Sequence, residues 1–344
     1  MKNIDGKLEF SFCVENIRKR PAMYIGSKYE RGVYALIHEL TWDVIYSSNK
    51  ADILIKIEIV ENDTIIFMCD SFINESIVLE IVIALSDICE LNWGNRSYIF
   101  KKGLFVSETN IVNNQNSFKI MFRPDKEIFL YKKLDYYMIF KRLKELAQLN
   151  GNVKILITDN ENKNILQFHN GLEVMLYENI YDFGLDCPPL NINFVKEGIE
   201  VSVSMLLGHP VDVAISYVND SKTHGGGSHV QGLYDGVYYS FKKYIKKFID
   251  GNIKFTKKDI IDLNFVINVR KNNPSYKGNT KRIMSDNETK ITVKNGVIES
   301  LDKILKLDQS FFDSSSIIRS AAMMHVFKLA LKQNNPDIDW FHDE

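Results

Sequence analysis

Apolar side chains recur along the chain with two different periods, which predict alternating helices and strands. Residues 30–49 place Val33, Leu36, Ile37, Leu40 and Val44 at helical spacing. Further helices are predicted at residues 76–91 and 134–149, the latter ending at an Asn-Gly pair. Residues 51–60 alternate with period two, and a turn joins them to the apolar run at 64–69, so this pair predicts a β-hairpin. Other short strands are predicted at residues 96–105, 117–123 and 153–158.

The second half repeats this mixture beyond a Pro-Pro pair at residues 188–189. Strands are predicted at 199–206, 212–218 and 260–270, and helices at 230–248 and 317–332. A long helix between two strands indicates a crossover connection within one sheet. Because 344 residues exceed one ordinary domain and prolines interrupt the pattern, we expect two domains, residues 1–190 and 191–344.

Composition indicates a soluble globular protein, with 45% hydrophobic and 25% charged residues. Net charge is −1, which excludes a globally basic protein that wraps nucleic acid. The apolar runs fall far short of the ~20 residues of a membrane span, and the N-terminus lacks a signal peptide. The four cysteines form no CxxC pair, so we expect reduced thiols, no membrane association and a cytoplasmic location.

The segment VENIRKRPAMYIG at residues 14–26 resembles the entry segment of the ATPase modules of gyrase B and topoisomerase IV B-type subunits. Matching segments follow in the family's order, among them HELTWDVIYSS at 38–48, FRPDKEIF at 122–129 and SYVNDSKTHGGGSHVQGLYDGV at 216–237. The resemblance implies an α+β chain, with a GHKL-type (Bergerat) α/β sandwich over residues 1–190. A transducer domain of ribosomal protein S5-like fold is implied over residues 191–344. The family's TOPRIM and DNA-cleavage parts have no counterpart, so strand passage would require separate subunits.

The resemblance also implies roles for individual residues, with ATP and Mg²⁺ as cofactors. Glu39 matches the general base, and Asp43 replaces the family's Mg²⁺-binding Asn one helical turn later. Asp70 matches the residue that binds adenine. Lys281 matches a lysine that contacts the γ-phosphate, and Asn279 takes the place of the neighbouring Gln. By residue type alone, Glu39 also fits an exposed helix carboxylate, and Lys281 equally fits a basic surface turn.

Several features of the family's nucleotide site are missing. The family continues after its adenine-binding Asp with a glycine-rich DGRGIP segment and a glycine-rich lid, whereas only thirteen residues separate Asp70 from Ala84. Ser117 and Phe118 stand where the family has Gly-Thr. Each charge-assisted hydrogen bond lost with the lid contributes ~1.5–3 kcal/mol, which predicts millimolar or weaker nucleotide affinity.

Three functions are consistent with this pattern. In the first, the chain is a stand-alone gyrase B-like pseudo-ATPase, a dimerising or partner-binding regulator of topoisomerase-type machinery. In the second, residual ATPase activity with Glu39 as base and Asp43 as Mg²⁺ ligand drives a clamp on DNA or partner subunits. In the third, a non-catalytic clamp binds DNA through lysines that otherwise form a solvated face: Lys242, Lys243, Lys246, Lys247, Lys257 and Lys258. The family's N-terminal arm, here residues 1–12, implies a homodimer, and the GGGSH loop is expected to be a structural turn.

Overall fold

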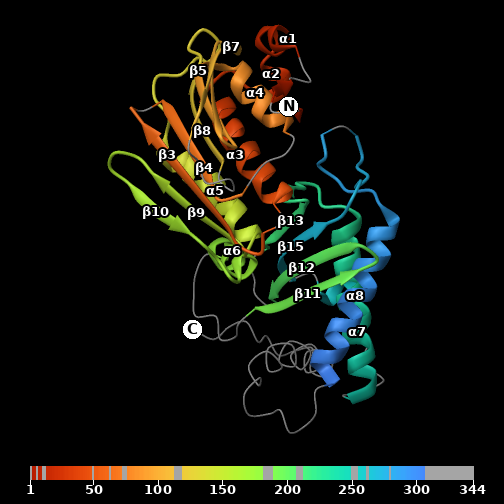
Figure 1. Ribbon diagram of the computed structural model, residues 1–344. Coiled ribbons are helices and arrows are strands. Elements are labelled where there is room, and N and C mark those ends of the chain that lie inside the picture. Colours follow the sequence, from red (N-terminus) through yellow and green to blue (C-terminus); the bar gives the residue numbers. More distant parts are fainter. Residues whose placement is uncertain are drawn as a thin grey trace. The chain divides into compact units, whose positions relative to one another are not determined.

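A computed structural model describes the chain at residues 2–4, 7–9, 13–48, 50–61, 63–71, 76–111, 118–180, 189–206, 212–248, 255–260, 263–278 and 280–306. The chain divides into two compact units, Met1–Gly171 and Leu172–Glu344, shown in Figure 1 and each considered by itself. The domain boundary expected near residue 190 falls within the second unit. The helix predicted at 317–332 lies outside the described residues.

An eight-stranded sheet forms the centre of the first unit, with the strand order β10-β9-β3-β4-β8-β5-β6-β7. The predicted hairpin is confirmed, because β3 and β4 pair antiparallel from Ile55–Cys69 to Val60–Thr64. The parallel pair β3–β9 adds the strand predicted at 153–158 to the same sheet. The strands are β3 (Ile53–Val60), β4 (Thr64–Cys69), β5 (Ser86–Trp93), β6 (Arg96–Lys101), β7 (Leu104–Asn110), β8 (Phe118–Pro124), β9 (Val153–Thr158) and β10 (Lys163–Leu166).

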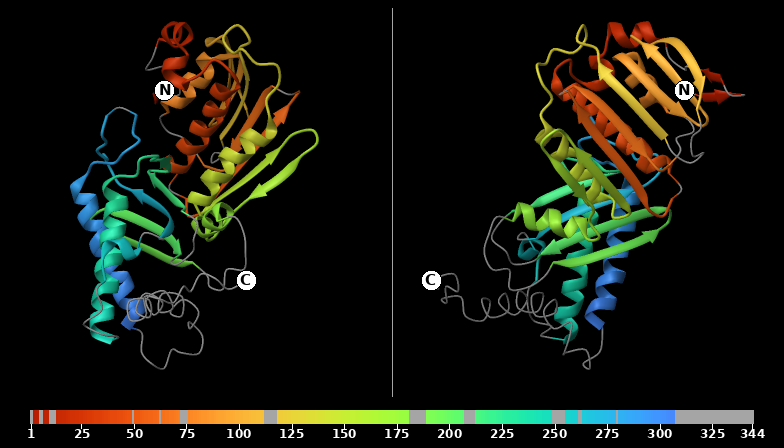
Figure 2. Two further views of the ribbon diagram at one scale, coloured as in Figure 1. Left: turned by 180° about the vertical axis from the view of Figure 1, so that it is seen from behind. Right: turned by 60° about the vertical axis from the view of Figure 1, so that its left-hand side comes forward.

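Helices cover one face of this sheet, so that the unit is a two-layer sandwich (Figures 1 and 2). Buried and more exposed positions alternate along β3, β4 and β8, as expected for strands with one covered face. The helices are α1 (Val14–Lys19), α2 (Ala22–Ile25), α3 (Glu30–Ser47), α4 (Ile77–Ala84) and α5 (Tyr136–Leu149). A short hairpin of β1 (Lys2–Ile4) and β2 (Lys7–Glu9) precedes them.

The second unit has a five-stranded sheet in the order β11-β12-β15-β13-β14. The predicted crossover is confirmed, because β13 and β15 pair in parallel and the chain between them includes the long helix α7. Helices α7 and α8 lie side by side (Figure 2). The elements are α6 (Gly171–Asn179), β11 (Leu190–Lys196), β12 (Ile199–Leu206), β13 (Ala214–Val218), β14 (Ser221–Lys222), α7 (Ser228–Phe248), the 3₁₀ turn η1 (Lys257–Ile260), β15 (Asn264–Arg270) and α8 (Asn287–Lys306).

The predicted elements were wrong in two places in the first unit. The helix expected over 76–91 ends at Ala84, and Ser86–Trp93 forms strand β5 instead. Burial of Cys89, Leu91 and Trp93 on one side of that strand provides the physical reason, since period-two burial favours a strand. The strand expected over 96–105 is a hairpin of β6 and β7. Helix α8 was not predicted.

Candidate nucleotide site

The RKRP segment joins three elements of the first unit. Arg18 of α1 donates a hydrogen bond to the carbonyl oxygen of Ala84 at the end of α4, at 2.8 Å. Its guanidinium also forms an ion pair with the buried carboxylate of Asp125, directly after β8. Burial tends to raise the pKa of Asp125, but hydrogen bonds from Arg18 and the Glu127 amide outweigh it and lower the pKa. Arg18 of this motif therefore has a structural role, joining α1, α4 and the end of β8.

Helix α3 carries the two carboxylates expected to act in catalysis. Glu39 is 55% exposed, and its Oε1 atom lies 3.3 Å from Nδ1 of His38. Asp43 lies one turn further and is partly buried; its Oδ2 atom accepts a hydrogen bond from the Ser76 hydroxyl. Burial raises the pKa of Asp43, the Ser76 bond opposes this, and the charge of Glu39 adds to it.

Ser76 also caps the next helix. Its Oγ accepts a hydrogen bond from the Leu79 amide at 3.0 Å, which satisfies one of the free N–H groups at the start of α4. The carboxylate in the expected metal position is thus hydrogen-bonded to the residue that starts α4.

Asp70 follows β4 at the predicted end of the strand, and both of its carboxylate oxygens have protein partners. Oδ1 accepts a hydrogen bond from the Leu54 amide of β3 at 3.0 Å. Oδ2 lies 3.2 Å from the ammonium of Lys50, which also donates to the Asp70 carbonyl. An adenine amino group would donate to this carboxylate, so the Lys50 ammonium competes with it for the same acceptor.

The connection between β4 and α4 is short and contains no glycine. Strand β4 ends at Cys69 and α4 begins at Ile77, so seven residues connect them. The sequence has no glycine between Gly32 and Gly94. Glycines let backbone amides approach a triphosphate closely, and this stretch offers none.

An aromatic pair fills the interior between β4 and β8. Phe67 of β4 and Phe118 of β8 are both buried, with ring centroids 6.3 Å apart in an edge-to-face arrangement. Phe118 stands where the family resemblance places a threonine hydroxyl. An apolar ring there offers neither a donor nor an acceptor to a base.

The residues expected to reach a γ-phosphate belong to the second unit. Lys281 is exposed in the loop before α8 and has a left-handed backbone, with φ of 53°. Asn279 lies outside the described residues.

The glycine loop that precedes α7 is hydrogen-bonded through its backbone to the loop that contains Lys281. The Gly225 amide donates to the Arg282 carbonyl at 3.0 Å, and the Met284 amide donates to the Gly226 carbonyl at 3.0 Å.

The third glycine of that loop is required by packing. A Cβ on Gly227 would lie 2.2 Å from the Met284 carbonyl oxygen, and its φ of 131° is a conformation that other residues rarely adopt. The glycines therefore serve backbone packing, and the Gly225 and Gly226 amides both have protein acceptors.

Among the described residues of the first unit, the carboxylates at the expected metal and adenine positions do not fit a magnesium nucleotide. The carboxylates expected to bind metal and adenine are both engaged by protein donors, at Ser76 and at Lys50 with Leu54. Within the described residues, no group of three or more His, Cys, Asp or Glu could hold a metal ion. We therefore derive no catalytic step through ATP or Mg²⁺.

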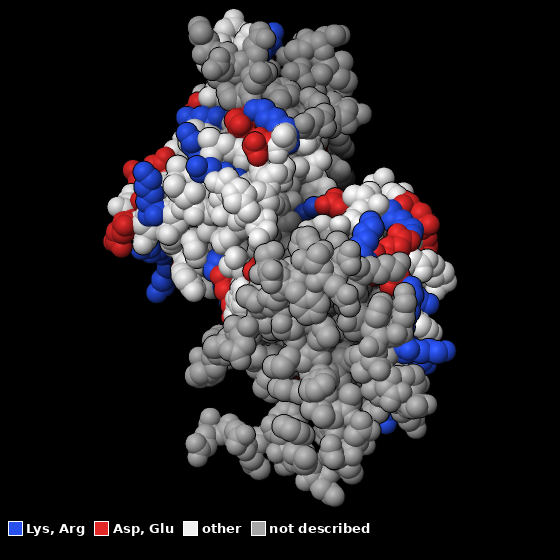
Figure 3. All heavy atoms as spheres, turned by 90° about the horizontal axis from the view of Figure 1, so that it is seen from below, with Lys and Arg blue, Asp and Glu red and all other residues white. Residues whose placement is uncertain are grey.

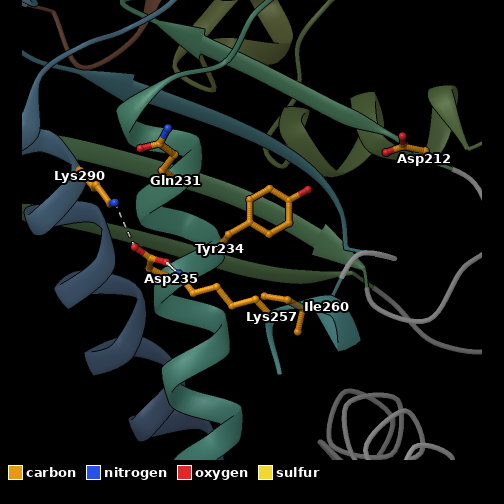
Figure 4. A pocket seen from close by; sticks show the side chains of 7 residues that line it. All are labelled: Asp212, Gln231, Tyr234, Asp235, Lys257, Ile260 and Lys290. Carbon is orange, nitrogen blue, oxygen red and sulfur yellow. Dashed lines mark hydrogen bonds and ion pairs between the residues drawn. The ribbon is translucent and has the colours of Figure 1, made fainter. Parts of the chain in front are cut away.

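A pocket of about 530 Å³ in the second unit is lined by α7, α8 and η1 (Figure 4). Asp235 forms ion pairs there with Lys257 and, at 3.4 Å, with Lys290. Burial tends to raise the pKa of Asp235, but these two ammonium groups outweigh it and lower the pKa. One carboxylate thus joins three elements and neutralises a lysine that the sequence assigned to a basic stretch.

Two other lysines of that basic stretch also contact neighbouring side chains. Lys243 pairs with Asp302 at 2.7 Å, and the Lys242 ammonium lies 5.4 Å from the centre of the Tyr238 ring. Among the residues drawn in colour in Figure 3, basic and acidic side chains lie next to each other. This arrangement is typical of a solvated surface.

Comparison with known proteins identifies the family. A family model for DNA gyrase B matches residues 157–333, just over half of the chain. The chain belongs to the DNA gyrase B family. The DNA gyrase B protein of Spiroplasma citri is 26% identical over 85% of this chain and 55% of its own length. The DNA gyrase B protein of Clostridium acetobutylicum is 25% identical over 84% and 53%. The chain thus spans about half the length of these curated relatives.

Solved structures give the same fold for the chain. The topoisomerase IV ATP-binding domain of Francisella tularensis aligns with a TM-score of 0.71 at 23% identity, covering 94% of this chain and 98% of that domain. The 43K ATPase domain of Thermus thermophilus gyrase B aligns with a TM-score of 0.73 at 20% identity, covering 93% and 98%. The predicted GHKL-type fold is therefore confirmed. None of the helices that the structure describes is long and apolar enough to cross a membrane.

Sequence reasoning missed two residues at this gyrase B-like site. Ser76 carries a usable signal, because a serine directly before an apolar helical run is a typical helix cap. Lys50 carries none. Its contact with Asp70 depends on the pairing of β3 with β4, which brings residues twenty positions apart together.

Proposed function

We propose that this gyrase B-like chain is a pseudo-ATPase that acts as a dimerising or partner-binding protein of topoisomerase-type machinery. One observation carries the proposal. The seven residues between β4 and α4 contain no glycine, and the last of them, Ser76, directs its hydroxyl to Asp43. The stretch lacks the glycines that would let backbone amides approach a triphosphate closely, and the carboxylate at the expected metal position already accepts a hydrogen bond.

The coupling of Lys50 to Asp70 supports the same conclusion. The ammonium supplies a positive charge and hydrogen-bond donors at the carboxylate that would read adenine. The pair is partly exposed, so its contribution to stability is small. The Lys50 ammonium instead occupies a carboxylate oxygen of Asp70 that would accept the adenine amino group.

Turnover of ATP by the full chain tests this function against a residual ATPase. Phosphate release is measured with Mg²⁺, with and without DNA, for the wild type and for Glu39→Gln and Asp70→Asn. The pseudo-ATPase predicts background rates for all three proteins. Wild-type turnover that either substitution abolishes would establish the residual ATPase instead.

Partner binding has its own test. Size-exclusion chromatography of the chain mixed with purified gyrase subunits of the same organism is expected to show a joint peak. Independent elution at all mixing ratios would contradict a role with that machinery.

A further inference from the structure

The second unit has a pocket that the proposed function does not use (Figure 4). Its volume of about 530 Å³ falls within the ~300–1,000 Å³ that is usual for small-molecule sites. Residues of α7, α8, η1 and the segment before β13 line it: Asp212, Gln231, Tyr234, Asp235, Lys257, Ile260 and Lys290. All of them belong to the second unit, whereas Asp43 and Asp70 belong to the first. The pocket is therefore a candidate site of its own.

Local structure brings these side chains together. Tyr234 and Asp235 lie three and four residues after Gln231 on α7, so the three share one face of the helix. Lys257 and Ile260 are three residues apart in the 3₁₀ turn η1, a spacing at which side chains lie in line. One face of a helix and one face of a turn thus supply most of the lining.

Two ammonium groups meet at one end of the pocket. The Asp235 carboxylate, with 14% of its side chain exposed, pairs with Lys257 and, at 3.4 Å, with Lys290. Two ammonium groups and one carboxylate leave a net positive charge, and each ammonium keeps donors that Asp235 does not use. The lysine side chains are 59% and 34% exposed, so a ligand can reach them. This end of the pocket therefore favours a carboxylate.

Close packing fixes one of these lysines beside Asp235. A Cβ on Gly232 of α7 would lie 2.6 Å from the Lys290 carbonyl oxygen, so the backbone of α8 lies directly against α7 here. Gly232 precedes Asp235 by less than one helical turn, and the packing of the two helices therefore sets where Lys290 meets the carboxylate. Groups that are already in place cost less ordering when a ligand binds.

An apolar wall adjoins the charged end. The Tyr234 ring packs edge-to-face on the buried Phe265 ring of β15, with centroids 5.6 Å apart, and Ile260 is buried as well. Burial raises the pKa of Tyr234, and the charge of Asp212 adds to this effect, so the hydroxyl stays protonated at neutral pH. The wall thus offers hydrocarbon and a neutral hydroxyl to a ligand.

Asp212 gives the pocket a negative end. Figure 4 shows Tyr234 between Asp212 and the group formed by Asp235 and the two lysines, with the Tyr234 hydroxyl directed to the Asp212 side. Among the residues that the structure describes, Asp212 has no ion-pair partner. Two lysines and two carboxylates sum to zero charge, but the charges are separated across the pocket. A ligand with the opposite separation of charge would be complementary to it.

We propose that this pocket binds a small zwitterion whose carboxylate and ammonium groups are separated by a hydrocarbon body. The carboxylate lies against Lys257 and Lys290, the hydrocarbon lies on Tyr234 and Ile260, and the ammonium lies at Asp212. Inorganic phosphate and triphosphates fit less well, because they have no cationic end to match the carboxylate. The proposal does not rest on the pseudo-ATPase, and its failure would leave the ATP turnover result unaffected.

An NMR titration of the full chain with ε-aminocaproate tests the proposal, with caproate and hexylamine as probes that each lack one charged end. A ligand of this size is expected to bind with a dissociation constant of about 1 mM. Caproate and hexylamine should each bind at least about threefold more weakly, because each loses an ion pair at a partly exposed site. The proposal would be overturned if ε-aminocaproate did not bind at ~10 mM, or if either of the other probes bound as tightly.

Single substitutions assign each end of the ligand. Lys290→Met should raise the dissociation constants of ε-aminocaproate and caproate at least about threefold, and Asp212→Asn should do so for ε-aminocaproate and hexylamine only. Lys258→Met is the matched control, since Lys258 is exposed beside Lys257 but does not line the pocket, and it should change no constant. Lys290→Met leaves Asp235 paired with Lys257, so its thermal unfolding should stay close to that of the wild type. Wild-type affinities in the Asp212→Asn variant, or equal weakening by Lys258→Met, would contradict the proposal.

Discussion

Arg18 and Asp125 show how a sequence motif can serve the fold instead of the chemistry. The motif VENIRKRPAMYIG led to the family, yet its Arg18 is used to join α1, α4 and the end of β8. A buried ion pair that loses one partner leaves an uncompensated charge, which is strongly destabilising.

Substitution Arg18→Ala should therefore lower the free energy of unfolding by about 3 kcal/mol at pH 7. The folded-state pKa of Asp125 is lowered, so the stability from this carboxylate is present above its unfolded pKa and is lost as the pH falls through the folded value. Urea unfolding at pH 7 and pH 3 measures both effects. Lys19→Ala, in an exposed pair with Glu15, is the control and should change nothing measurable.

The buried imidazole of His229 should make the stability of the protein depend on pH. It is buried, its Nε2 atom lies 3.2 Å from the Thr223 hydroxyl, and burial lowers its pKa to about 4. The unfolded chain, with an imidazole pKa of about 6.5, binds the proton more readily. The contribution of His229 to the free energy of unfolding is therefore fully present above about pH 6.5. It falls by up to about 3 kcal/mol as the pH drops toward 4.

Urea unfolding between pH 7.5 and pH 4.5 measures this loss. His229→Leu removes the titrating ring and should flatten that part of the profile, at a cost of about 1 kcal/mol at neutral pH for the lost hydrogen bond. An unchanged slope in the variant would show that other groups cause the pH dependence.

At the scale of elements, two helices of the second unit depend on close backbone contact. A Cβ on Gly232 of α7 would lie 2.6 Å from the Lys290 carbonyl oxygen of α8, and a Cβ on Gly236 would lie 2.7 Å from the Cβ of Val297. The two glycines, four residues apart, lie on the same side of α7 and allow α8 to approach.

Gly236→Ala should consequently destabilise the protein by about 1–3 kcal/mol, although alanine normally favours a helix. Thermal or urea unfolding measures the change. Gln231→Ala, at an exposed position of the same helix, should be neutral or slightly stabilising. A stabilised Gly236→Ala variant would mean that α7 and α8 are not in contact there.

The sequence predicted elements best where the hydrophobic pattern was long. Helices α3 and α5 and the β3–β4 hairpin follow from their periodicity. The change from α4 to β5 was missed because Ser76 to Leu91 is too short an apolar stretch to separate the two periods. In the candidate site, Glu39, Asp43 and Asp70 could be named from family resemblance. Their partners Ser76 and Lys50 depend on tertiary contacts, which no local pattern encodes.

The whole molecule has the fold of gyrase B ATPase domains, and we propose that its site chemistry differs. Gyrase B-like architecture extends over both units, while Asp43 accepts a hydrogen bond from Ser76 and Asp70 accepts one from Leu54. Core packing maintains a fold without regard to a ligand, whereas affinity depends on a few donors at fixed places. This difference explains how the fold and the site can diverge.

Calorimetric titration of the full chain with a non-hydrolysable ATP analogue and Mg²⁺ tests the central claim most directly. We expect no saturable heat below millimolar concentration, because the short β4–α4 connection contains no glycine and Lys50 competes for Asp70. Saturable binding in the micromolar range, weakened by Asp70→Asn, would contradict the account.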